Sequence, residues 1–235
     1  MRAVSIVGWK KSGKTTVAVA LAEELARQGL VVGAIKHSHH GLDAPDTDTA
    51  RLAAVCRSVV GLGPGAWAVW GQGERSPQDL MPLMACQVLV VEGGKEWGWL
   101  PRIVVAPHGT EDVGALITGR ELGVFGPQPV AGLPATEDVA ELAQWVLQRG
   151  FALAGLDCGA CGMASCAVLA AAVVAGQASA GDCVAQHGRR LQVRCGETSL
   201  ALGPFVERLL GATLRGMLSE LKGYTPGQPV RIDLE

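Results

Sequence analysis

Short apolar runs alternate with amphipathic stretches over the first 150 residues of the chain. β-branched and other apolar residues predict buried strands at residues 3–7, 30–35, 66–71, 87–91, 103–105 and 115–118. Val17, Leu21 and Leu25 fall on one helical face and predict a helix that begins at Thr15, with Gly29 at its carboxyl end. Thr136 is expected to cap another helix. The alternation of strands and helices is typical of an α/β fold with a mostly parallel sheet.

The pattern changes near Gly150. Residues 158–181 carry no charged side chain and are rich in Ala and Gly. Beyond them, the spacing predicts a hairpin over 191–202, a helix between Phe205 and Leu221, and a final strand at 230–234. We therefore predict two domains, residues 1–152 and residues 153–235, of which the second is a small α+β module.

The composition excludes several classes of protein. Of the 235 residues, 49% are apolar and 18% are charged, which is enough apolar material for a packed core. The net charge of −2 provides no basic field for nucleic acid or an anionic membrane. No secretory signal or membrane-spanning run is evident, so a cytoplasmic protein is expected.

A phosphate-binding loop is the strongest motif in the N-terminal part. Gly8-Trp9-Lys10-Lys11-Ser12-Gly13-Lys14-Thr15 fits the pattern G-x-x-x-x-G-K-[ST] between a strand and a helix, and we expect these residues and Thr16 to bind a nucleotide. Lys14 is expected to bridge the β- and γ-phosphates and Thr15 to hold Mg²⁺. The alternative is a chance turn of glycines and lysines. The Trp9 indole is expected either to cover a phosphate or base or to pack on the sheet.

Acidic side chains near the predicted ligand crevice are candidates for supporting Mg²⁺ or the attacking water. Glu92 ends an apolar strand, where such a carboxylate usually stands, and Asp48 is the second choice. Asp48 lies in a loop that follows His37, His39 and His40. We expect this loop to contact the nucleotide or a partner, with a polar surface loop and a transition-metal site as alternatives.

These segments together resemble the molybdopterin-guanine dinucleotide biosynthesis protein B (MobB) family. The resemblance rests on G-W-K-K-S-G-K-T-T, I-K-H-S-H-H, D-A-P-D-T-D-T-A-R and L-V-V-E-G-G-K, in that order, and covers residues 1–149. It departs at Pro45-Asp46-Thr47-Asp48-Thr49, where the family usually has P-G-K-D-S, although Asp48 still matches the acid. No N-K-x-D element for reading guanine is evident.

The resemblance implies a P-loop protein that binds GTP with Mg²⁺ and hydrolyses it slowly. It further implies an accessory role in attaching a guanine nucleotide to molybdopterin, with the transfer itself made by a MobA-type nucleotidyltransferase. A homodimer is implied as well. On this interpretation Lys14, Glu92 and Asp48 are the catalytic candidates, and Thr15, Asp48 and Glu92 are the candidate Mg²⁺ ligands.

Four of the seven cysteines form the second strong motif, Cys158-x2-Cys161-x4-Cys166-x16-Cys183. Thiolates at short spacing in a glycine-bearing loop, with a fourth after a helix, favour a 4Fe-4S cluster. Structural zinc and unligated buried thiols are the alternatives. Residues 157–183 resemble the small 4Fe-4S domain of corrinoid iron-sulfur proteins. Cys56, Cys86 and Cys195 lack partners at ligand spacing and are expected to be core or surface thiols.

The sequence therefore predicts a weak P-loop GTPase that assists maturation of a molybdenum or tungsten cofactor and carries a 4Fe-4S cluster. Two alternatives remain open. One is a nucleotide-driven ATPase for metal insertion or electron transfer, and the other is a GTP-bound adaptor in which hydrolysis is incidental. Expected partners are a transferase and molybdopterin or a molybdoenzyme.

Overall fold

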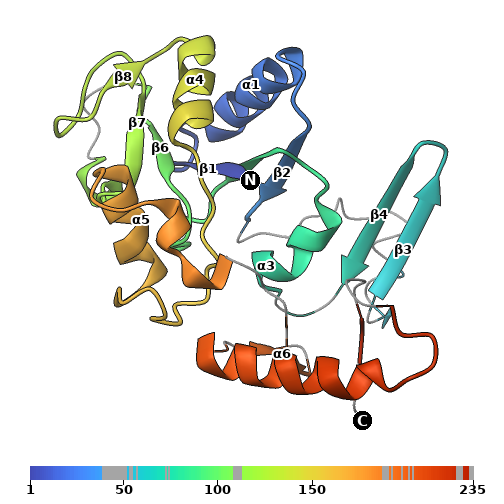
Figure 1. Ribbon diagram of the computed structural model, residues 1–235. Coiled ribbons are helices and arrows are strands. Elements are labelled where there is room, and N and C mark those ends of the chain that lie inside the picture. The colour runs from blue at the N-terminus through green and yellow to red at the C-terminus, as the bar shows by residue number, and fades with distance from the viewer. Residues whose placement is uncertain are drawn as a thin grey trace.

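A six-stranded parallel sheet forms the centre of the molecule (Figure 1). The computed structural model describes residues 1–38, 52, 55–56, 58–71, 73, 75–107, 113–186, 191, 193–196, 198–200, 202, 204–225 and 230–232. The strand order is β2 (Val32–Lys36), β5 (Val88–Glu92), β1 (Arg2–Gly8), β6 (Arg102–Val105), β7 (Glu121–Phe125) and β8 (Ala135–Thr136), and every neighbouring pair is parallel. The predicted α/β class is confirmed.

One face of the sheet is covered by two helices, α1 (Lys14–Arg27) and α4 (Val139–Arg149). Successive strand residues point to opposite faces, so Val4, Ile6 and Val90 share one core cluster with Leu21 and Leu142 of the helices. All five are fully buried or nearly so. This side is the conventional helical layer of an α/β protein.

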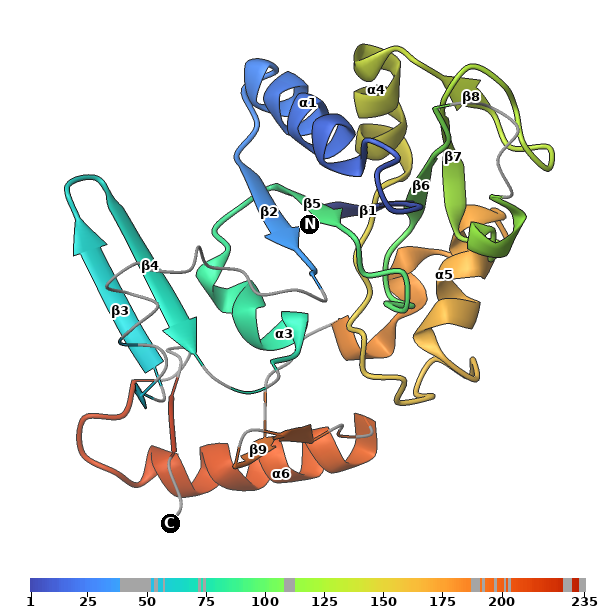
Figure 2. The same cartoon turned by 180° about the vertical axis from the view of Figure 1, so that it is seen from behind.

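The opposite face is covered by the segment that follows α4. Ala3, Leu89 and Val91 point to this side and pack in one cluster with Phe151 and with Leu169 of α5 (Cys166–Val174). Figure 2 shows α5 across the sheet from α1 and α4. The cysteine-bearing segment thus supplies part of the core of the sheet.

Smaller elements lie around this centre. They are the hairpin β3 (Ser58–Gly63) and β4 (Ala66–Gly71), the short helix α3 (Pro77–Leu80), the hairpin β9 (Val193–Cys195) and β10 (Thr198–Leu200), the helix α6 (Pro204–Ser219), and 3-10 turns at Met81–Leu83, Gly114–Leu116, Ala180–Asp182 and Val184–Gln186. Figures 1 and 2 both place the β3–β4 hairpin and α6 apart from the central sheet. Large apolar side chains of the hairpin, Val60, Leu62, Trp67 and Val69, are exposed. Among the described residues, no helix is both long and apolar enough to span a membrane.

Three sequence-based expectations are wrong. Residues 115–118 do not form a strand, because Leu116 is buried by a 3-10 turn and Gly119 turns the chain with φ 84° before β7. Thr136 ends β8, and Asp138 caps α4 instead by accepting a hydrogen bond from the Ala140 amide. Residues 230–232 have no regular secondary structure, and 233–235 lie outside the described residues. The strand at 66–71 is confirmed, but it is exposed and not buried as expected, and its partner β3 was not predicted.

Leu169→Ala tests whether the cysteine-bearing segment and the sheet share one cooperative core. Leu169 is 1% exposed, so its truncation is expected to lower the free energy of unfolding by about 2–5 kcal/mol. Urea unfolding followed by far-UV circular dichroism would measure the change for the whole chain. Val168→Ala on the exposed side of α5 is the control and is expected to cost about 0.5 kcal/mol or less. An unchanged main transition in Leu169→Ala would contradict the shared core.

Candidate functional site

The loop between β1 and α1 has the conformation that a phosphate-binding loop requires. Gly13 has φ 85° and Lys11 has φ 65°, so the backbone turns through left-handed conformations before α1 begins. A Cβ at Gly8 would lie 2.5 Å from Ser12 Oγ and 3.0 Å from the Val105 carbonyl oxygen, so only glycine fits there. No side chain caps α1. The amino end of the helix therefore faces the loop with amide donors for an anion.

Two further features of the loop suit a phosphate group. Ser12 is buried, and its Oγ has no hydrogen-bond partner among the described residues. Buried hydroxyls rarely lack a partner, so this one marks a place for an acceptor. Lys14 Nζ donates to the Trp9 carbonyl oxygen at 2.5 Å, which folds its ammonium group over the loop.

The charge of Lys14 is destabilised in this position. Partial burial lowers its pKa most, and the positive charge of Lys95 lowers it further, while the carboxylate of Glu92 opposes the shift. Lys36 is a smaller repulsive neighbour. An anion bound in the loop would relieve this repulsion among lysines.

Glu92 lies at the carboxyl end of β5, directly beside the loop. The parallel register pairs Glu92 with Ile6 of β1 and with Lys36 of β2. Its Oε1 accepts a hydrogen bond from Thr15 Oγ1 at 2.7 Å, and its Oε2 lies 3.3 Å from Lys36 Nζ. The structure thus brings together two of the three side chains that the sequence proposed as Mg²⁺ ligands, and oxygens this close can be ligands of the same cation.

The second candidate acid, Asp48, lies outside the described residues, as do His39, His40, Asp43 and Asp46. His37 is described and turns toward the residues after β5. Its amide donates to the Glu92 carbonyl oxygen at 2.9 Å, and its Nδ1 lies 3.2 Å from Glu96 Oε1.

Lys95 is a site residue to which the sequence assigned no role. Its Nζ lies 4.5 Å from the centre of the Trp9 ring, a cation–π contact at the edge of the loop. Trp9 is 38% exposed, so its indole is not part of the sheet core. The sequence signal for Lys95 is its place at the end of the motif L-V-V-E-G-G-K, three residues after Glu92.

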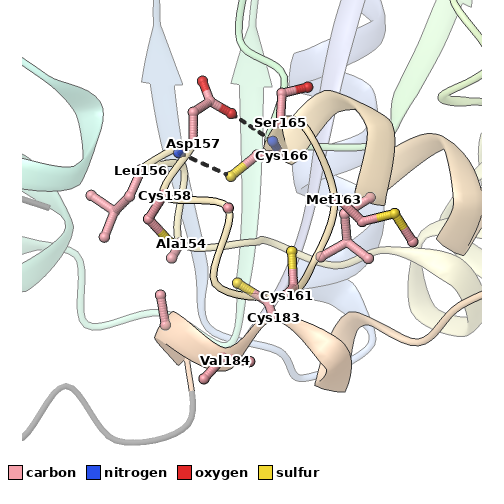
Figure 3. Close-up of a pocket in the computed structure, with 13 residues that line it drawn as sticks. Ala154, Leu156, Asp157, Cys158, Cys161, Met163, Ser165, Cys166, Cys183 and Val184 are labelled. Atoms are coloured by element: carbon pink, nitrogen blue, oxygen red, sulfur yellow. Dashed lines mark hydrogen bonds between the residues drawn. The ribbon is translucent and has the colours of Figure 1, made fainter. Parts of the chain in front are cut away.

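The four motif cysteines line a single pocket on the other side of the sheet. Figure 3 shows Cys158, Cys161, Cys166 and Cys183 around it, on the loop before α5 and on the turn that follows the helix. Ala154, Leu156, Met163 and Leu169 make most of the remaining wall apolar. Cys166 and Cys183 are buried, and burial raises the pKa of the Cys166 thiol. The Cys166 thiol would therefore ionise more readily with a metal bound than in the metal-free pocket.

Asp157 holds the loop of this pocket in place. It has φ 46°, a left-handed conformation, and its Oδ1 accepts a hydrogen bond from the Cys166 amide at 2.5 Å. The Asp157 amide in turn donates to Cys166 Sγ at 3.4 Å. Amide donors of this kind stabilise sulfur ligands of iron-sulfur clusters.

All seven cysteines are described, and none forms a disulfide. No three His, Cys, Asp or Glu side chains in the described ranges converge on one point closely enough for a single metal ion. Cys86 is half-buried and contacts Met1 Sδ, whereas Cys195 is exposed.

The parallel sheet, the glycine-lysine loop and the uncapped α1 define a P-loop α/β protein. Residues 3–118 match the family "Molybdopterin guanine dinucleotide synthesis protein B", and residues 153–185 match the family "Putative Fe-S cluster". Residues 3–118 therefore form a domain of the MobB family type, and a segment that matches an iron-sulfur family follows it.

Individual relatives agree with this assignment. A Methanocaldococcus jannaschii protein named "Putative molybdopterin-guanine dinucleotide biosynthesis adapter protein" is 24% identical over 100% of this chain and 98% of its own length. A crystal structure of Bacillus subtilis MobB superposes with a TM-score of 0.52 at 24% identity, covering 62% of this chain and 98% of the other. A second Bacillus subtilis MobB structure gives a TM-score of 0.50 at 23% identity, covering 62% and 98%. The structural similarity establishes the fold, and the full-length relative extends across both parts.

Asp157→Ala tests the local support of the cysteine pocket. It removes the acceptor of the Cys166 amide and places alanine in a left-handed conformation, so we expect a loss of about 1–2 kcal/mol in the free energy of unfolding. The thiols of the metal-free protein should also become more accessible to alkylation, measured by mass spectrometry. Asp157→Asn keeps an acceptor and tolerates the conformation, and it should behave like the wild type. Equal behaviour of the two variants would argue against this role.

Proposed function

We propose that this protein binds GTP with Mg²⁺ and acts as an adaptor in biosynthesis of the molybdopterin guanine dinucleotide cofactor. The main support is the hydrogen bond between Thr15 and Glu92 beside the uncapped end of α1, because it places a P-loop hydroxyl next to a carboxylate that could bind Mg²⁺. The family of the N-terminal domain supports the pathway. Guanine preference follows from that family and not from any residue identified above.

GTP hydrolysis is the chemistry that this site supports best. Residues 8–16 would hold the phosphates through backbone amides, and Lys14 would leave the Trp9 carbonyl oxygen to contact the β- and γ-phosphates. Mg²⁺ would neutralise charge that develops on the phosphate oxygens. Thr15 and Glu92 would hold the ion, and Glu92 or Asp48 would orient the water that attacks the γ-phosphate. Asp48 remains the second candidate for this role.

We also propose a 4Fe-4S cluster held by Cys158, Cys161, Cys166 and Cys183. Four thiols around one apolar pocket, with an amide donor to Cys166 Sγ, fit such a group. The match of residues 153–185 to an iron-sulfur family supports it. When bound, the cluster would supply one-electron chemistry or a redox-sensitive structural element.

The name of the Methanocaldococcus jannaschii relative favours an adaptor, in which GTP hydrolysis is incidental, over an enzyme. We therefore place the transfer chemistry in a partner, a MobA-type nucleotidyltransferase, with molybdopterin or a molybdoenzyme as the further contact. A homodimer remains a prediction from the family resemblance. A GTP-binding variant that does not hydrolyse GTP but still supports cofactor assembly would favour the adaptor. Preference for ATP would favour the alternative of a metal-insertion or electron-transfer ATPase.

Lys14→Ala tests the nucleotide site. Hydrogen bonds to charged groups contribute about 1.5–3 kcal/mol, so GTP affinity should fall roughly 10- to 100-fold. Isothermal titration with GTP and Mg²⁺ would measure this loss. Lys222→Ala removes an exposed lysine after α6 and should bind GTP like the wild type. Normal binding and hydrolysis by Lys14→Ala would refute the assignment.

Iron, sulfide and zinc analysis of protein purified without oxygen tests the metal site. Roughly four irons and four sulfides per chain, with visible absorption that bleaches on reduction, are expected. Cys161→Ser should lose most of this iron, whereas Cys195→Ser should keep it, because Cys195 is exposed on β9. A content of one zinc and no iron would contradict the cluster and indicate a structural zinc site.

A further inference from the structure

Residues 93–99, here called the strap, lie in the connection from β5 to β6 and pack against the cysteine-bearing segment. The strand order places β1 between β5 and β6, so the connection from β5 to β6 must cross β1. A helix usually makes such a crossing in a parallel sheet. Here the chain crosses without a helix, through turns in which Gly93 and Gly94 have positive φ, and Figure 2 shows it running from β5 toward α5.

Every second carbonyl oxygen of the strap accepts a hydrogen bond from a different part of the chain. Ser5 Oγ donates to Gly93 at 2.6 Å, Arg102 Nη2 to Lys95, Arg120 Nη1 to Trp97 at 2.6 Å, and the Leu153 amide to Trp99 at 2.9 Å. The first donor comes from β1 beside the phosphate loop. The last comes from the segment that leads to the cysteine pocket. The strap is therefore fixed at both ends and between them.

The two arginines occupy positions where a charge is costly. Arg102 is 3% exposed and Arg120 is 5% exposed. Burial and the neighbouring charge of Arg120 lower the pKa of Arg102 to about 10. Arg102 Nε and Glu121 Oε2 have no hydrogen-bond partner among the described residues. Burying two charges is costly, so the hydrogen bonds that these side chains donate to the strap are what explains their position.

The far end of the strap packs directly on the cysteine-bearing segment. A Cβ at Gly98 would lie 2.8 Å from the Cβ and 3.1 Å from the amide nitrogen of Ala167, the residue after Cys166. A Cβ at Gly155 would lie 3.0 Å from Trp99 Cγ. The rings of Trp97 and Trp99 stack with centroids 6.1 Å apart. Movement of the first turn of α5 would therefore displace Gly98.

The near end of the strap belongs to the nucleotide site. Gly93 follows Glu92, and a Cβ at Gly93 would lie 2.9 Å from the His37 carbonyl oxygen, so little space is left for the backbone to shift. Lys95, which lies over Trp9, is part of the strap itself. The positions of Glu92 and Lys95 thus depend on how the strap is held.

We propose that Arg102 and Arg120 are positioning residues that act through the strap on Glu92, and that the state of the cysteine pocket changes Mg²⁺-nucleotide affinity through the same strap. This inference rests on the proposed function of the nucleotide site. A pocket that holds its ligand keeps Cys166 and Ala167 in place, which keeps Gly98 and the strap in place. Linkage requires the reverse effect as well, so bound Mg²⁺-nucleotide stabilises the pocket.

Gly98→Ala tests the strap at the contact with α5. The added methyl group separates Gly98 from Ala167 without touching the nucleotide site. Arg120→Met tests it independently by removing the donor to the Trp97 carbonyl oxygen while keeping much of the side-chain volume. Cys161→Ser removes a proposed ligand from the pocket. Gly216→Ala is the matched control, because a Cβ there meets nothing within 4 Å.

The measurement is the affinity of a fluorescent GTP analogue, with Mg²⁺ and with EDTA, in folded protein as judged by thermal melting. We expect Gly98→Ala, Arg120→Met and Cys161→Ser to bind roughly tenfold more weakly with Mg²⁺, a usual size for coupling between sites. Their affinities in EDTA should equal that of the wild type, because Glu92 acts through the ion. Gly216→Ala should match the wild type in both conditions. Amides of residues 94–99 should exchange hydrogen faster in the three affected variants.

Several outcomes would overturn the inference. Unchanged Mg²⁺-dependent affinity in Gly98→Ala and Arg120→Met would contradict the positioning role of the strap and its arginines, but not the proposed nucleotide site. Equal weakening with and without Mg²⁺ would indicate general distortion instead. Weaker Mg²⁺-dependent binding in these variants but not in Cys161→Ser would show that the cysteine pocket is not coupled to the nucleotide site. If nucleotide binding by the wild type does not depend on Lys14, the proposed function fails. In that case the hydrogen exchange of residues 94–99 still tests the strap, because unchanged exchange in the variants would contradict its proposed contacts.

Discussion

The second face of the parallel sheet must be covered, and this constraint shapes the rest of the structure. Leu89 and Val91 are fully buried on that face, yet the connection from β5 to β6 contains no helix. A connection without a helix covers less of a sheet than a helix does, so other apolar material has to complete the layer. Phe151, Leu153 and Leu169 provide it. The segment that carries the cysteines is for this reason also a structural layer of the nucleotide-binding sheet.

This arrangement determines how the two candidate sites are related. The parallel register places Glu92 beside the phosphate loop, where Thr15 reaches it. The chain then has to leave that edge and return across β1, and it does so in contact with the cysteine-bearing segment. The strap consequently touches both sites as a result of topology. A helix in its place would have satisfied its own carbonyl groups and would have needed no donors from Arg102, Arg120 or Leu153.

Local patterns predicted the parts of the structure that depend on local physics. The phosphate loop, the first strand and helix, and Glu92 at the end of β5 follow from glycine placement and apolar periodicity, which act within a few residues. The run at 115–118 failed because three apolar residues fit a buried turn as well as a strand, and Gly119 decides between them. The strap was beyond such reasoning, because its donors come from residues 5, 102, 120 and 153. No periodicity marks hydrogen bonds between side chains and distant backbone groups.

The buried arginines are best understood through what an apolar replacement would lose. Apolar side chains at 102 and 120 would avoid the desolvation of two charges and their mutual repulsion. They would also leave the carbonyl groups of Lys95 and Trp97 without donors in a covered layer, where an unpaired carbonyl is costly. A helix would remove that need but would move Lys95 and Gly98 from their present contacts. A strap without helical structure, held by buried cationic donors, thus keeps one end of the segment at the nucleotide site and the other at the cysteine pocket.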